Sequence, residues 1–258
     1  MPIDFANLPP TWERLLATGL LVSIRVSSLM LFAPVFSSKA IPVRIKAGFV
    51  FAIAFLLTPV VMELGPAPAI NASSVLGELS VGLVFGFALS LMNEALAFAG
   101  QLLGIDFSFS LVNLMDPNSQ IETPVLGQFL GWIGILVLLA CGLERTMLAA
   151  FMRTFAAIPV GQAVMHANSG IELAHMTAGV LLGGLQLAAP VMCAALMVEV
   201  VVGLIARISP QLPVMAVNVP VKTLVSYGVL IASLGIWPLW IEHNFTNLLN
   251  AAERLVRG

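Results

Sequence analysis

Apolar residues dominate this chain in long runs, and no other feature constrains its fold as strongly. Of its 258 residues, 59% are hydrophobic and only 9% are charged, whereas soluble domains carry about 25% charged residues. A helix needs about 20 apolar residues to cross a bilayer. Six runs reach or approach that length, near 15–36, 45–62, 75–98, 125–142, 176–206 and 221–241. The sequence therefore predicts an all-α, multi-helix protein of the integral membrane type.

Prolines and glycines indicate that these helices are not all straight spans. Pro190 lies inside the long fifth run, and proline kinks or breaks a helix, so a kinked helix or a broken hairpin is expected there. The more amphipathic stretch 145–159 either continues the fourth run after a break at Gly142 or folds back on it. Close helix packing is predicted by four Gly-xxx-Gly pairs, which are Gly82/Gly86, Gly100/Gly104, Gly127/Gly131 and Gly179/Gly183.

Lysine and arginine residues divide evenly between the two sides that six simple crossings would create. With the N-terminus outside, five of them fall inside and five outside, and Arg25 falls within a span. Multi-span proteins normally carry an excess of Lys and Arg in their cytoplasmic loops. The even division argues against an ordinary multi-span topology.

Several charged residues lie in apolar context, where a charge is costly unless it meets a partner or water. Arg25 lies near the middle of the first run, Glu78 opens the third, and Glu94 lies within the third. Glu199 lies inside the fifth run and Arg207 ends it, two helical turns later, so these two could share a face. The charges could form a proton or ion relay, or each could pair with another helix or subunit. Glu78 could also simply favour a helix N-terminus.

No residue pattern typical of an enzyme is visible. His166 and His175 do not have the i, i+4 spacing of a helical zinc pair, His243 stands alone, and there is no phosphate-binding GxxxxGK motif. Cys141 and Cys193 lie in apolar runs and are interpreted as small core residues. We therefore expect a protein that is not an enzyme and uses no cofactor or metal. The small net charge of −2 argues against nucleic acid as a partner.

The segment from Gly100 to Pro124, GQLLGIDFSFSLVNLMDPNSQIETP, is too acidic for a span and too apolar for a solvent loop. Residues 103–111 alternate with period two, which favours an extended or irregular segment. Asp116 and Pro117 then predict a turn. Irregular backbone at membrane depth survives only when it is buried in protein or lines a water-filled path. The segment is therefore either a plug in such a path or a re-entrant loop packed on neighbouring helices.

Four segments together point to a known family. They are Arg25 with the following PVFSSKAIPVRIKAGF, then GELSVGLVFGF, then GQLLGIDFSFSLVNLMDPNSQIETPVL, and finally EVVVGLIARISPQLPVMAVNVPVK. In order and spacing, from about residue 20 to 230, they resemble the FliR family of flagellar export-gate proteins, whose injectisome relatives form the SctT family. Two departures stand out. Leu114 and Met115 replace two aromatics found in many members, and Leu212 and Pro213 stand where the family has an asparagine.

This resemblance implies one subunit domain over 1–258, built from kinked and broken helical hairpins, with an irregular plug-like loop at about 104–122. Family members join FliP-family and FliQ-family subunits in a helically arranged gate at the core of a type III secretion system. That gate lies largely above the bilayer plane, which would account for the even charge division. Further implied partners are FlhB-family and FlhA-family components and unfolded flagellar proteins in transit. The implied location is the flagellar basal body in the bacterial inner membrane.

The resemblance also assigns roles to residues, because the family's matching loop lies in the central pore and helps to plug it. The apolar closure would comprise Phe107, Phe109, Leu111, Leu114 and Met115. The loop geometry would depend on Gly100, Gly104, Asp116 and Pro117. Charge pairs in assembly would involve Arg25, Glu78, Glu199, Arg207 and Lys222. The alternative function is a secondary transporter of a small solute that uses Arg25, Glu94 and Glu199, with a midplane site between internal repeats.

Overall fold

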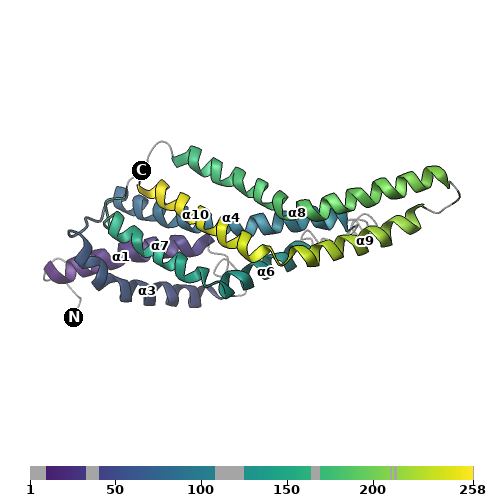
Figure 1. The fold of residues 1–258 in the computed structure, drawn as a ribbon. Helices are drawn as coiled ribbons and strands as arrows, with labels where there is room; N and C mark the ends of the chain where they lie inside the picture. The colour runs from purple at the N-terminus through teal and green to yellow at the C-terminus, as the bar shows by residue number, and fades with distance from the viewer. Residues whose placement is uncertain are drawn as a thin grey trace. The chain divides into compact units, whose positions relative to one another are not determined.

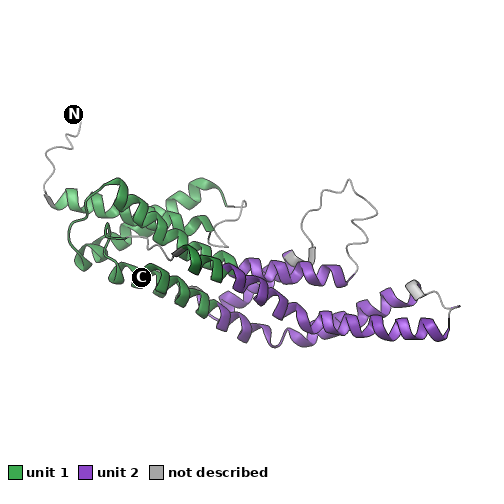
Figure 2. Cartoon of the chain, turned by 90° about the horizontal axis from the view of Figure 1, so that it is seen from above, with its two compact units in different colours: residues 1–91, 144–176, 245–258 green, residues 92–143, 177–244 purple. Residues whose placement is uncertain are grey.

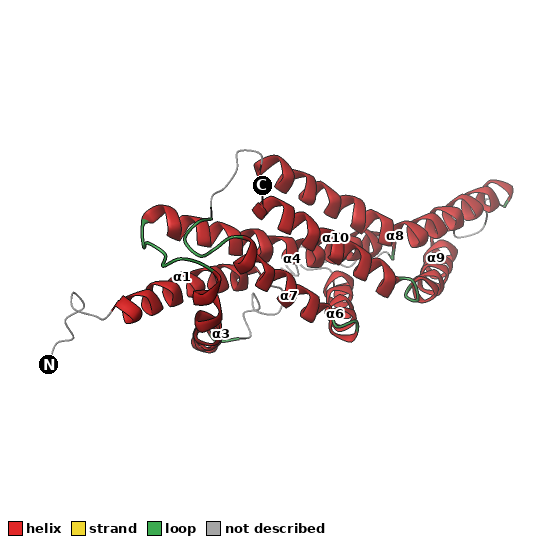
Figure 3. Ribbon diagram, turned by 60° about the vertical axis from the view of Figure 1, so that its left-hand side comes forward, coloured by secondary structure: helices red, strands yellow, loops and turns green. Residues whose placement is uncertain are grey.

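The computed structural model describes residues 10–32, 41–107, 125–163, 169–209, 211 and 214–257, and these form helices joined by turns and loops (Figures 1 and 3). In chain order the helices are α1 (Pro10–Phe32), α3 (Val43–Leu64), α4 (Ala72–Asp106), α6 (Val125–Ala140), α7 (Leu143–Ala157), α8 (Ser169–Ile208), α9 (Val214–Ser233) and α10 (Trp237–Arg257). No residue within the described ranges belongs to a strand. The predicted all-α fold is confirmed.

Within the part of the chain that the structure describes, five helical segments are long and apolar enough to cross a bilayer. They are Thr11–Phe32, Val43–Leu64, Ala72–Asp106, Gly170–Ile208 and Ala216–Ser233. A sixth candidate would be the broken pair Gln128–Ala140 and Arg145–Ala157. The composition-based prediction of a membrane-type protein is therefore matched by helices of the required length.

Helix α4 extends well past the third predicted run. The run was expected over 75–98, but the helix continues to Asp106, and the Phe107 N–H still donates to the Leu103 carbonyl at 2.9 Å. The segment predicted to be irregular from about residue 104 is therefore helical as far as Asp106. Residues 104–106 were assigned wrongly.

The reason for this error lies in two overlapping patterns at the end of α4. Leu103 and Phe107 are buried, whereas Ile105 is exposed, so the period-two alternation coincides here with the i, i+4 spacing of a helix. Gly100 and Gly104 lie inside the helix. The bend that these glycines were expected to allow stays a prediction.

The stretch 145–159 forms a separate helix. α6 ends at Ala140 and α7 begins at Leu143, and Gly142 between them has φ +67°. This left-handed conformation commonly ends helices, and glycine adopts it without strain. The predicted break at Gly142 is confirmed.

The fifth predicted run is a single helix, α8, with Pro190 inside it. Figure 1 shows α8 bending part of the way along its length. Proline removes a backbone donor and crowds the preceding turn, which accounts for a kink in a helix that stays continuous. Of the two expectations, the kinked helix is confirmed and the broken hairpin is wrong.

The sixth predicted run, 221–241, was placed wrongly. α9 ends at Ser233 and α10 begins at Trp237, so the run spans the turn between two helices. Most of α10 belonged to no predicted run because the helix is amphipathic rather than uniformly apolar. Its buried residues recur at helical spacing, and they include Ile241, Phe245 and Leu249.

The described helices belong to two compact units (Figure 2). Unit 1 comprises residues 1–91, 144–176 and 245–258, and unit 2 comprises residues 92–143 and 177–244. The unit boundaries fall within α4, α8 and α10 and after the first residue of α7, so each of these helices contributes to both units. The single domain over 1–258 stays a prediction.

In unit 1, α1 packs closely on α4 at two glycines. A Cβ atom added at Gly82 would overlap the Ser28 hydroxyl, and one added at Gly86 would lie 2.6 Å from the Leu29 carbonyl oxygen. Both approaches are too close for any side chain, so the missing Cβ atoms let the two backbones meet. The close packing predicted from this Gly-xxx-Gly pair is confirmed.

The start of α4 is fixed by a reciprocal cap. The Asn71 side-chain oxygen accepts from the Ser74 N–H at 2.7 Å, and the Ser74 hydroxyl accepts from the Asn71 N–H at 3.0 Å. Such an exchange satisfies donors that have no partner within the helix. Glu78 therefore lies beyond the first turn, and its suggested role at the helix N-terminus is wrong.

In unit 2, α8 approaches α4 at another glycine. A Cβ atom added at Gly184 would lie 2.6 Å from Phe98 Cδ1 and 2.8 Å from the Ala95 carbonyl oxygen. The Trp240 indole at the start of α10 donates to the Gln186 side chain of α8 at 3.2 Å. The helices of this unit are thus held by close backbone packing and by polar contacts.

Candidate functional site

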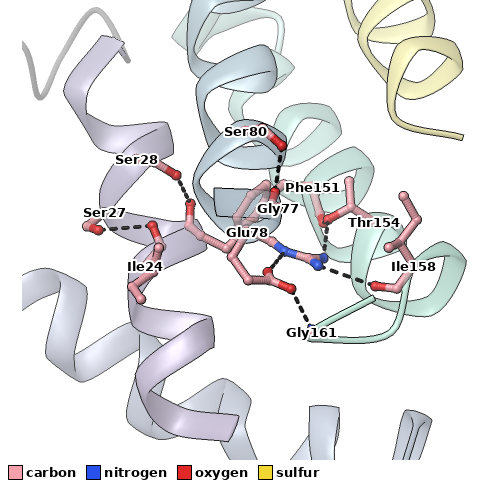
Figure 4. Close-up of polar contacts among 11 residues, drawn as sticks. Ile24, Ser27, Ser28, Gly77, Glu78, Ser80, Phe151, Thr154, Ile158 and Gly161 are labelled. Atoms are coloured by element: carbon pink, nitrogen blue, oxygen red, sulfur yellow. Dashed lines mark hydrogen bonds and ion pairs between the residues drawn. The ribbon is translucent and has the colours of Figure 1, made fainter. Parts of the chain in front are cut away.

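Arg25 of α1 and Glu78 of α4 form a buried ion pair in unit 1 (Figure 4). Arg25 Nε lies 2.5 Å from Glu78 Oε2, and both side chains are 0% exposed. Two charges removed from water in this way need further hydrogen bonds to offset the desolvation. Their other contacts therefore decide whether this pair is a structural centre or a site open to a ligand.

The remaining nitrogens of Arg25 meet α7 and the residue that follows it. Nη1 donates to the Thr154 hydroxyl and Nη2 to the Ile158 carbonyl, each at 3.3 Å. The guanidinium carbon lies 4.4 Å from the centre of the Phe155 ring, a cation–π contact. Every nitrogen of Arg25 thus has a partner within unit 1.

The second oxygen of Glu78 accepts a backbone hydrogen bond. Gly161 N–H donates to Glu78 Oε1 at 2.7 Å, and Figure 4 shows this bond on the side of the carboxylate away from Thr154. Gly161 has φ +84°, and an added Cβ would lie 3.0 Å from Pro68 Cβ. Because side chains rarely tolerate that φ, glycine is the residue that can present its N–H here.

The Arg25–Glu78 centre is therefore satisfied by its own unit. Three helices and the turn after α7 contribute to it, and neither side chain has a polar atom without a partner. The transporter alternative gains no support, because Arg25 is fully engaged and Glu94 is exposed. Sequence reasoning missed Thr154, Phe155 and Gly161, since their roles depend on how α7 packs against α1 and α4.

A second polar cluster in unit 2 joins three helices. Lys222 Nζ of α9 lies 2.6 Å from Glu199 Oε1 of α8 and 3.5 Å from Asp106 Oδ1 at the end of α4. The side chains of Lys222 and Asp106 are 11% and 17% exposed, and Glu199 is about half exposed. The lysine thus lies largely buried between two carboxylates.

One ammonium group in this cluster serves two acids, and it lies closer to Glu199. Among the described residues, Asp106 Oδ2 and Ser226 Oγ are buried without a hydrogen-bond partner. Ser226 lies one turn from Lys222 on α9. Asp106 therefore has the longer and weaker contact with Lys222, and loss of the lysine charge would leave Asp106 without a counter-ion in this cluster.

An aromatic pair lies next to this cluster. The rings of Phe107 and Tyr227 are stacked, with centroids 4.4 Å apart and planes inclined by 29°. Phe107 is 4% exposed. Sequence reasoning did not single out Tyr227, although it is the chain's one tyrosine and lies in an apolar run, where a phenol calls for a specific neighbour.

The predicted charge pairs are divided between the two units. Arg25 pairs with Glu78, and Glu199 pairs with Lys222 of the next helix rather than with Arg207 of its own. Arg207 is exposed at the end of α8. The suggested pairing of Glu199 with Arg207 is therefore wrong, because α9 brings a cation closer.

Most of the predicted plug lies outside the described residues. Phe107 and the two loop glycines are described, and both glycines belong to α4. The residues outside are Phe109, Leu111, Leu114, Met115, Asp116 and Pro117. In the described ranges, no group of three or more His, Cys, Asp or Glu side chains could hold a metal ion.

Comparison with known proteins gives consistent matches over most of the chain. The family model for bacterial export proteins, family 1, matches residues 16–248. Flagellar biosynthetic protein FliR of Escherichia coli (strain K12) is 25% identical over 236 residues, which is 90% of each chain. The protein of that name from Caulobacter vibrioides is 28% identical over 228 residues, 86% of this chain and 90% of the relative. The one from Bacillus subtilis (strain 168) is 27% identical over 245 residues, 92% of this chain and 93% of the relative.

Proposed function

This chain belongs to the bacterial export proteins, family 1, and from that membership we propose that it helps to form and to plug the channel of a flagellar export gate. It is a membrane-embedded subunit of flagellar type III protein export. The observation that carries this function is the family match over residues 16–248. Unfolded flagellar proteins would pass through the channel when the plug opens.

The exposed apolar faces of the helices support assembly into a gate. In the apolar window of α3, only 17% of the residues are buried inside the chain, and Phe51 and Phe55 on this helix are strongly exposed. Such continuous apolar surface marks contact with lipid or with other subunits. We assign these faces to FliP-family and FliQ-family subunits, with FlhB-family and FlhA-family components as further partners. The proposed location is the bacterial inner membrane.

The proposed plug is the segment between α4 and α6. Phe109, Leu111, Leu114 and Met115 would form a compliant apolar closure, since aromatic and thioether side chains can repack around varied substrates. Asp116 and Pro117 would turn the chain back towards α6. The acidic and apolar character of this stretch supports the proposal, because irregular backbone at membrane depth suits a protein-lined path.

Deleting residues 108–115 tests the plug and leaves Asp106 and Phe107 in place. The full chain is expressed with its export partners, and the ion permeability of the cells is measured. We expect the deletion to leak ions. The matched control replaces the same residues with a glycine–serine linker of equal length, which should also leak because it lacks apolar side chains. A deletion variant that still assembles and stays ion-tight would exclude the plug.

Co-purification tests the assembly independently. The tagged full chain should bring down two further membrane protein families in a constant ratio. Recovery of the chain alone, or as a small homo-oligomer, would contradict membership of a multi-subunit gate. Separation of inner and outer membranes on a density gradient checks the proposed location, which predicts the chain in the inner-membrane fraction.

A further inference from the structure

We propose that α9 holds the end of α4 through two separate contacts, Lys222 with Asp106 and Tyr227 with Phe107, so that Phe107 anchors the plug instead of sealing the channel. This inference, which rests on the proposed function, deepens it by assigning control of the closure to a helix outside the plug segment. All four residues belong to unit 2 and are described by the structure.

The two contacts act on consecutive residues in different directions. Successive side chains on a helix point about 100° apart, so Asp106 and Phe107 hold the end of α4 from two sides. Asp106 meets an ammonium group 3.5 Å away, and Phe107 meets a ring with a centroid separation of 4.4 Å. Together they resist both rotation and displacement of the point from which the plug segment leaves α4.

The burial of Phe107 sets it apart from a sealing residue. A side chain that seals a channel faces the path, whereas Phe107 is 4% exposed and stacked on Tyr227 within its own unit. Its backbone N–H also continues the helical bonding by donating to Leu103. Phe107 therefore belongs to the end of the helix, and the sealing role falls to residues further along the chain.

Glu199 competes with Asp106 for the same lysine. Lys222 Nζ lies 2.6 Å from Glu199 and 3.5 Å from Asp106. When the charge of Glu199 is removed, Lys222 can pair with Asp106 alone. The Lys222–Asp106 contact should then hold the end of α4 at least as firmly as in the unchanged protein. Removing the charge of Lys222 leaves Asp106 without a cation. The two changes therefore have opposite consequences, although both break the same 2.6 Å ion pair.

The test measures ion leak through the full chain assembled with its export partners. Lys222→Met and Tyr227→Ala should each raise the leak about three- to tenfold, because each removes one of two contacts that hold the closed state. Glu199→Gln, Tyr227→Phe and Lys222→Arg are matched controls and should stay at the original level. Recovery of the partner subunits checks assembly, and Tyr227→Leu replaces Tyr227→Ala if the smaller residue prevents it.

Double variants separate an anchor from a seal. Phe107→Ala combined with Tyr227→Ala should leak no more than either alone, since both remove one contact. Phe109→Ala combined with Tyr227→Ala should leak more than either alone. A leak from Phe107→Ala with a tight Tyr227→Ala would overturn the inference and make Phe107 a sealing residue.

The leak measurements distinguish a wrong anchor from a wrong plug. If the 108–115 deletion leaks while Lys222→Met and Tyr227→Ala both stay tight, the plug stands and the anchor is wrong. If the deletion stays tight, the plug is wrong, and the anchor falls with it. A leak from Glu199→Gln equal to that of Lys222→Met would also overturn the competition between the two acids.

Discussion

Arg25 and Glu78 are 53 residues apart in the sequence and meet as a fully buried ion pair, with 2.5 Å between Nε and Oε2. Their other hydrogen bonds go to Thr154, Ile158 and Gly161. The pair therefore ties α1 to α4 and both helices to the end of α7. A buried pair adds little net stability over apolar residues, but breaking it leaves an uncompensated charge.

Removing the carboxylate should destabilise unit 1 strongly. Glu78→Gln keeps the side-chain volume but leaves Arg25 buried without its counter-ion, a loss of about 3–5 kcal/mol. The measurement is the thermal stability of the detergent-solubilised complex. Glu94→Gln is the matched control, since Glu94 lies on the same helix and is exposed. Equal stability of the two variants would contradict a structural role for the pair.

Exchanging the two charges should not restore stability. In the double variant Arg25→Glu with Glu78→Arg, the Gly161 N–H would face a cation and the Ile158 carbonyl would face an anion. These backbone groups are fixed by the turn after α7, so the site has one polarity. We expect thermal stability no higher than that of Glu78→Gln. Recovery to the original value would show that only the ion pair matters.

Adding a methyl group at Gly82 should force α1 away from α4. The new Cβ would overlap the Ser28 hydroxyl, and overpacking of this kind costs about 1–3 kcal/mol. Gly48→Ala on α3 is the control, because nothing lies within 4 Å of a Cβ added there. The control should be neutral or stabilising by up to about 1 kcal/mol, because alanine favours helix. Thermal melts of the two assembled variants measure this difference.

Comparing Gly161→Ala with Gly142→Ala distinguishes the cost of backbone strain from the cost of displacing the Gly161 hydrogen bond to Glu78. Both have positive φ, +84° and +67°, so alanine at either should cost about 1–2 kcal/mol. Gly161→Ala should cost more, because its Cβ would lie 3.0 Å from Pro68 Cβ, whereas Gly142 faces open space. Melting curves compare the two. Equal losses would mean that the Gly161 N–H bond to Glu78 adds nothing beyond the strain.

Much of the fold follows from local patterns. The break at Gly142, the kink expected at Pro190 and the close approach at Gly82 and Gly86 were all predicted correctly. Each depends on one residue's own backbone or volume, which the sequence states directly. α10 escaped prediction because its apolar residues occupy one face, so a search for continuous apolar runs finds only its beginning.

The sequence by itself determined the helical, membrane-type class of this protein and its family, because apolar length and ordered motifs are properties of the chain alone. Only the tertiary structure decided which charges meet. Glu199 meets Lys222 and not Arg207, and Arg25 meets Glu78. Such pairs depend on which helices pack together, and helices far apart in the chain leave no local trace of their neighbours. Phe107 likewise became an anchor candidate only when α9 brought Tyr227 to its ring.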